Sequence, residues 1–202
     1  MKNQSILVLS IFAIIILQSC RVDLGLQSQY KRLSENDKEK IIFLEPNAEI
    51  CELKKDGKIY GITGKQLLEC IETQENVMVY FWKWSCTSDL CYPLIHVQKY
   101  CDERGLILYA VVADSYRSRM FLELESLSKP LFAINEFHYQ EKKPTKFIKL
   151  FMEDLLKDPE LSKEIWWHGS YVFNHGKLVD SNIIMEVGNA GELKTIEFKF
   201  GE

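Results

Sequence analysis

Residues 77–91 read VMVYFWKWSCTSDLC, and this stretch indicates the fold more strongly than any other part of the chain. Its first part, from Val77 to Trp82, is a near-continuous apolar run, which is typical of a strand buried on both faces of a sheet. Such a strand delivers Cys86 from its carboxyl end to the start of the next helix. Helix N-termini expose unpaired N–H groups and a partial positive charge, which lower the pKa of a nearby thiol. Cys86 is therefore predicted to be a reactive cysteine.

A second cysteine, Cys91, completes a Cys-x4-Cys pair and could resolve a mixed disulfide formed at Cys86. Residues five apart on one helix lie about 140° apart around its axis, so a bridge requires Cys86 to lie outside the helix. The sequence offers two helix starts, with either Ser88 as the N-cap or Pro93 as the first helical residue. We expect Cys86 to attack and Cys91 to resolve. The alternative is a buried cysteine pair that packs like small apolar side chains.

Strands and helices alternate on both sides of this stretch. Helices are predicted from the cap at Thr63 through Ile71, along the apolar stripe that ends at Cys101, and over 118–127 and 144–156. Further strands are expected at 106–113, 131–137, 171–173 and 177–179. Asp56-Gly57, between the runs 49–53 and 58–62, predicts an N-terminal β-hairpin. The order predicts an α/β fold with a mixed sheet.

The segment Phe81-Trp82-Lys83-Trp84-Ser85-Cys86 resembles the signature of the thioredoxin superfamily, and residues 171–178 resemble its late hairpin. The likeness spans roughly residues 60–182, and the N-terminal additions are similar to those of TlpA-like envelope oxidoreductases. The resemblance implies a thioredoxin-like mixed β-sheet flanked by helices, with an N-terminal β-hairpin extension. It also implies that Cys86 is the nucleophile and that Trp84, beside it, contacts the substrate.

Three positions depart from the thioredoxin pattern. Asp89 stands at the family's resolving position, Tyr80 replaces its buried acid, and His168 stands at the position of its cis-proline. We therefore expect His168 to lie near the two cysteines and to contact the substrate. Trp167, just before it, is expected in the core or as a wall of the site.

Two other functions use the same residues. Cys86, Cys91 and His168 could bind copper, because thiolate and imidazole are ligands that copper accepts, and copper-delivery members of the superfamily use two cysteines and a histidine. A redox-inactive thioredoxin-fold binding module is the third possibility, because a fold does not specify a function. The exchange reaction itself needs no cofactor.

The N-terminus has the features of a secretory signal: Lys2, then an apolar run from Ile6 to Leu17 that is shorter than the ~20 residues of a spanning helix. The run ends in Leu17-Gln18-Ser19-Cys20, which resembles the lipobox of bacterial lipoproteins. We expect residues 1–19 to be the signal peptide, 20–47 a polar tether and 48–202 the thioredoxin-like domain. The protein is then anchored through acylated Cys20 to a bacterial membrane of the cell envelope, expected to be the outer membrane, on its periplasmic or surface side.

The net charge of the chain indicates which classes of partner to expect. A chain of 202 residues with a formal charge of -4 has no basic footprint, so nucleic acid is not an expected partner. The expected partners are protein thiols or disulfides of the envelope, and the membrane through Cys20. In that compartment Cys51 and Cys70 could also pair, which would leave Cys101, on the apolar helix stripe, as the odd cysteine.

If Cys20 is the lipidated N-terminus, mass spectrometry of the membrane-extracted protein will find residues 1–19 absent and acyl chains on Cys20, because removal of the signal peptide leaves Cys20 as the first residue. Replacing Cys20 with Ser should release the protein from the membrane fraction. An intact Met1 peptide in the mature protein would contradict the prediction.

Overall fold

Strand β3, Val77–Trp82, is buried along its whole length inside a seven-stranded sheet. The computed structural model describes residues 30–83, 92–113, 116–141 and 143–182, and the short strands 186–187 and 193–194. β3 pairs in parallel with β4, Ile107–Val112, and antiparallel with β6, Ser170–Asn174. The predicted central strand and its buried character are therefore confirmed.

The order of the sheet is β1-β2-β5-β4-β3-β6-β7. The five strands from β1 to β3 in this order are parallel, and β6 and β7 are antiparallel to β3 and to each other. The remaining strands of the sheet are β1 (Ile41–Phe43), β2 (Ile59–Ile62), β5 (Leu131–Ile134) and β7 (Lys177–Ser181). Glu186–Val187 (β8) and Leu193–Lys194 (β9) form a separate two-stranded sheet. The predicted α/β class with a mixed sheet is confirmed.

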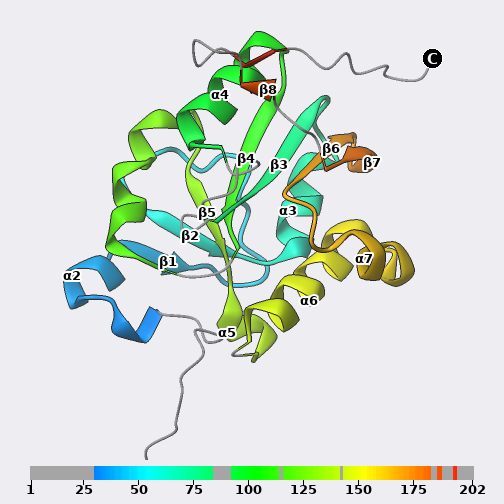
Figure 1. Ribbon diagram of the computed structural model, residues 1–202. Helices are drawn as coiled ribbons and strands as arrows, with labels where there is room; N and C mark the ends of the chain where they lie inside the picture. Colours follow the sequence, from blue (N-terminus) through cyan, green and yellow to red (C-terminus); the bar gives the residue numbers. More distant parts are fainter. Residues whose placement is uncertain are drawn as a thin grey trace, which may run out of the picture.

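Helices cover both faces of the sheet (Figure 1), because successive residues of β3 point to opposite sides. Met78, Tyr80 and Trp82 enter one core, and Val77, Val79 and Phe81 enter the other. The first face carries η1 (Tyr30–Arg32), α2 (Glu35–Lys38), α4 (Leu94–Glu103), η2 (Ser118–Leu122) and η3 (Leu124–Ser126). The second carries α3 (Gly64–Ile71), α6 (Pro144–Leu156) and α7 (Pro159–Ile165), with α5 (Glu136–Tyr139) beside α6. Among the described residues, no helix is both long and apolar enough to cross a membrane.

The predicted N-terminal hairpin is wrong. β2 pairs in parallel with β1 through Ile41 and Ile59, and residues 49–53 form no strand. The turn itself is present, with Gly57 at a φ of 80°, but tertiary bonds hold the preceding segment elsewhere. The Gln66 side-chain amide donates to the carbonyls of Glu45 and Ala48, both at 2.9 Å, and so ties this segment to α3. Because β1 also lies within residues 20–47, the sheet begins inside the segment expected to be a polar tether.

Other local predictions have mixed outcomes. Thr63 forms a complete capping box with Gln66 at the start of α3, and α6 spans the predicted 144–156. The predicted helix at 118–127 is instead two short 3-10 helices, η2 and η3. The strand predicted to reach residue 137 stops at Ile134, because the Asn135 side chain accepts from the His138 N–H and caps α5.

Gly64 begins α3 where the helix touches α6, and a Cβ there would collide with the backbone carbonyl of Phe151. Although alanine is the better helix former, Gly64→Ala should lower the free energy of unfolding by about 1–3 kcal/mol, because neither backbone can give way. Urea denaturation measures the change. Gly169→Ala is the matched control, since a Cβ at Gly169 meets no atom within 4 Å. Equal stability of the two variants would contradict this account of helix packing.

Candidate functional site

The chain leaves β3 at Trp82 and begins α4 at Leu94, and the two ends of this connection are tied together. The Tyr92 N–H donates to the Tyr80 hydroxyl at 3.1 Å. Burial raises the pKa of Tyr80 to about 12, so its hydroxyl stays protonated at neutral pH. The tyrosine that replaces the expected buried acid therefore closes the connection.

Trp84, Cys86, Ser88 and Cys91 lie in this connection, outside the described residues. Helix α4 has Pro93 as its N-cap and Leu94 as its first residue. The helix therefore starts one residue after the later of the two predicted positions, and both cysteines precede it in the chain. Residues five apart on one helix lie on different sides of it, but this does not prevent a Cys86–Cys91 bridge, because neither cysteine belongs to α4.

A second segment reaches the same edge of the sheet. The Phe81 N–H donates to the Gly169 carbonyl at 2.8 Å, so residues 166–169 lie beside the carboxyl end of β3. The chain leaves β3 for α4 on one face and arrives from α7 on the other. In α/β sheets, ligands bind beyond the carboxyl ends of strands where neighbouring connections diverge to opposite faces. The candidate site is therefore this edge, bordered by the end of β3 at Trp82 and by residues 166–169.

The backbone of His168 lies at this edge, but its imidazole has partners of its own. Nδ1 lies 2.9 Å from the Ser181 hydroxyl oxygen on β7, and the ring stacks on Tyr171 with centroids 6.2 Å apart. Burial lowers the pKa of His168, and Glu164 opposes this with a smaller effect. The imidazole is therefore mostly neutral at pH 7. A neutral His168 does not supply the positive charge that would stabilise a thiolate at Cys86.

Trp167 offers an exposed aromatic surface next to His168. Its side chain is 55% exposed, although the sequence favours a place in the core. The indole N–H donates to the Glu164 carbonyl at 2.9 Å, and the ring meets the His168 ring edge-on at 4.4 Å. Its neighbour Trp166 is the partly buried one and packs on the second core. Nothing in the apolar pattern distinguishes the two tryptophans, because they are adjacent at the end of a short helix.

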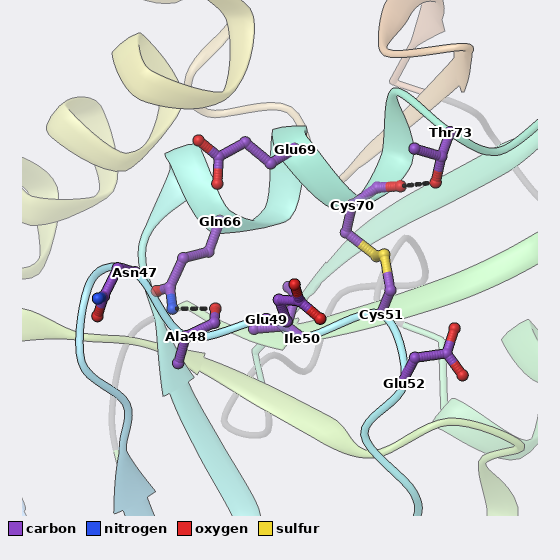
Figure 2. A pocket seen from close by; sticks show the side chains of 10 residues that line it. All are labelled: Asn47, Ala48, Glu49, Ile50, Cys51, Glu52, Gln66, Glu69, Cys70 and Thr73. Atoms are coloured by element: carbon purple, nitrogen blue, oxygen red, sulfur yellow. Dashed lines mark hydrogen bonds between the residues drawn. A yellow bond between two sulfur atoms is a disulfide. The ribbon is translucent and has the colours of Figure 1, made fainter.

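Cys51 and Cys70 form a disulfide, with Cα atoms 5.3 Å apart. It joins the segment before β2 to α3, on the second face of the sheet. The two cysteines are 19 residues apart, and closing a loop of about that length stabilises a fold by about 3 kcal/mol in the chain-entropy model. The pairing that the sequence left open is thus resolved, and the bond lies in a groove of about 390 Å³ (Figure 2).

Cys101 is a core residue, as its place on the helix stripe predicts. Its Sγ lies 3.5 Å from the Met78 sulfur, and burial raises its pKa to about 12. Within the described residues, no group of three His, Cys, Asp or Glu side chains could hold a metal ion. The copper ligand set from the sequence includes Cys86 and Cys91, which lie outside that part of the chain.

Comparison of the chain with protein-family models, curated proteins and solved structures found no match. The geometry of the carboxyl edge of β3, and the residues that follow it in the sequence, are therefore what supports a function.

NMR titration should place the pKa of His168 below the ordinary histidine value of about 6.5, because burial disfavours the imidazolium. The unfolded chain then binds this proton more readily than the folded one, so the free energy of unfolding falls as pH drops below that value. His168→Ala identifies the resonance and should remove this part of the pH dependence. A His168 pKa above the ordinary value would contradict this prediction and would again allow a charged His168 to stabilise a thiolate at Cys86.

Proposed function

We propose that this protein performs thiol–disulfide exchange as a lipid-anchored protein of the bacterial cell envelope, with Cys86 attacking and Cys91 resolving. The observation that carries the proposal is the position of their connection. It begins at the carboxyl end of a strand buried on both faces and is closed by the Tyr80–Tyr92 hydrogen bond. The resemblance of residues 81–86 to the thioredoxin signature supports the same assignment, and a thioredoxin-like topology is part of the proposal.

The reaction proceeds in two displacements. The Cys86 thiolate attacks one sulfur of a substrate disulfide, forms a mixed disulfide and expels the other substrate sulfur as a thiolate. The Cys91 thiolate then attacks the Cys86 sulfur and releases the second substrate thiolate. Two electrons pass to the substrate, which takes up two protons, while Cys86 and Cys91 become a disulfide. The same steps in reverse oxidise a substrate dithiol.

Two features support a polypeptide substrate in an oxidising compartment. Trp167 presents an exposed ring beside the edge that the cysteine connection leaves, and exposed aromatic side chains are common anchors in protein recognition. The Cys51–Cys70 disulfide supports a location outside the cytoplasm, because stable disulfides are rare inside it. Trp84 is proposed to extend this docking surface next to Cys86.

Alkylation rates measured against pH test the nucleophile. Cys86 should react half-maximally below the pH of about 8.5 at which a free thiol does, because in the sequence it follows a buried strand and precedes a helix, whose N-terminus favours a thiolate. Cys101 is the internal control, since its pKa of about 12 keeps it a thiol at neutral pH. A Cys86 that titrates like a free thiol, or that is inaccessible, would contradict the catalytic assignment and favour a binding module.

A pair of serine variants tests the order of attack. Cys91→Ser should accumulate a mixed disulfide on Cys86 when the protein is mixed with an oxidised polypeptide, because the resolving thiol is missing. Cys86→Ser should accumulate none. The opposite pattern would exchange the roles of the two cysteines.

A further inference from the structure

The groove at the Cys51–Cys70 disulfide is lined by acidic side chains as well as by the two cysteines. Figure 2 shows ten side chains around it, and they include Glu49, Glu52 and Glu69 but no lysine or arginine. Glu69 pairs with Lys65 at 3.7 Å, whereas Glu49 and Glu52 form no ion pair within the described residues. Lys129 lies beside the groove, where its Nζ donates to the Cys51 carbonyl at 3.3 Å, and the three lining carboxylates outnumber this ammonium. A positively charged molecule is therefore favoured in this groove over a negatively charged one.

The two sulfurs differ in access. Both cysteines line the groove, but Cys51 is half-buried, whereas Cys70, on the buried side of α3, is only 3% exposed. A thiolate that enters the groove can approach the Cys51 sulfur, and attack on a disulfide sulfur expels the other one. The geometry thus selects Cys51 as the sulfur attacked and Cys70 as the leaving group.

Two side chains that can donate hydrogen bonds lie beside the Cys70 sulfur. The Tyr109 hydroxyl lies 3.1 Å from the Cys70 sulfur and the Gln74 amide nitrogen 3.4 Å from it. The Gln74 amide nitrogen donates to the Tyr109 oxygen at 2.9 Å, and the Tyr109 hydroxyl can donate to the Gln74 side-chain oxygen at 3.1 Å. A thiolate at Cys70 is a stronger acceptor than this neutral amide oxygen, so the hydroxyl proton can turn to it. Burial raises the pKa of Tyr109, so the hydroxyl keeps its proton at neutral pH. The Gln74 nitrogen also lies 3.6 Å from the Cys51 sulfur, so Gln74 does not distinguish the two sulfurs, whereas the Tyr109 hydroxyl lies beside Cys70. Because hydrogen bonds to an anion are about twice as strong as neutral ones, the hydroxyl favours Cys70 as the leaving group.

We propose that Cys51–Cys70 is a second thiol-exchange site, at which a small thiol carrying a positive charge attacks Cys51 and expels Cys70 as a thiolate. A new disulfide forms between Cys51 and the small thiol while the Cys51–Cys70 bond breaks. A second molecule of the thiol can attack the outer sulfur of that adduct, releasing its own disulfide and a Cys51 thiolate. The two thiols together supply the two electrons. A groove of about 390 Å³ suits a small molecule, and the site is independent of the exchange proposed at Cys86.

Two thiols of opposite charge test the groove on the full-length, detergent-extracted protein. Cysteamine carries an ammonium and 2-mercaptoethanesulfonate a sulfonate. After correction for the thiolate fraction of each, cysteamine should form the Cys51 adduct on the order of fivefold faster at low salt, with the difference shrinking at high salt. Peptide mass spectrometry locates the adduct. Equal rates, or an adduct on Cys70, would overturn the proposal.

Charge variants show whether the groove causes this preference. Glu49→Gln with Glu52→Gln should remove most of it, because these two residues line the groove and form no ion pair within the described residues. Glu35→Gln with Glu160→Gln is the matched control, since it makes the same change in net charge at exposed ion pairs elsewhere. A preference that survives the first pair, or that is lost equally in the control, would show that the groove does not select the thiol.

Removing the donor to Cys70 tests the leaving group. Tyr109→Phe should slow adduct formation on Cys51 by about threefold to tenfold, because the developing thiolate loses a hydrogen bond. Tyr60→Phe is the control, since its hydroxyl binds Asp56 at 2.9 Å rather than a sulfur. Loss of the fold would expose Cys70 and speed the reaction, so a slower rate cannot arise from unfolding. A rate equal to that of the control would overturn the role of Tyr109.

Discussion

Strand β3 has no face in contact with solvent, and the arrangement of the other elements depends on this burial. Its alternate side chains supply two separate cores, so the sheet needs helices on both sides. A chain that leaves β3 for α4 on one face and returns from α7 on the other must pass the same edge of the sheet twice. That edge is where the candidate exchange site lies.

Burial also forces the polar groups of β3 to find partners. The Tyr80 hydroxyl is inside the first core, where an unpaired hydroxyl is costly, and it takes the Tyr92 N–H. The same bond closes the connection that contains Cys86 and Cys91. One interaction therefore satisfies a buried hydroxyl and joins the two ends of this connection.

The described cysteines show how surroundings decide sulfur chemistry. Cys101 lies against Met78 in an apolar core that keeps it protonated, so it serves packing alone. Cys70 is nearly as buried, but Tyr109 and Gln74 provide donors beside its sulfur. Burial without donors makes a thiol inert, whereas burial beside donors makes a good leaving group. Exposure of Cys51 to an acidic groove adds a preference for the charge of the attacking thiol.

Local pattern alone determined β3, the capped start of α3, the full length of α6 and the hairpin of β6 and β7, because periodicity, caps and tight turns act over a few residues. It also predicted the alternation of strands and helices from β2 onward, and hence the α/β class. Tertiary structure alone decided that β1 joins the sheet in parallel, that Cys51 bonds to Cys70, and that His168 is held by Ser181. Each of these joins segments that lie too far apart in the chain for local pattern to specify. In the same way, a strong Asp-Gly turn signal was insufficient to make a hairpin, because the bonds from Gln66 and Cys70 hold the preceding segment against α3.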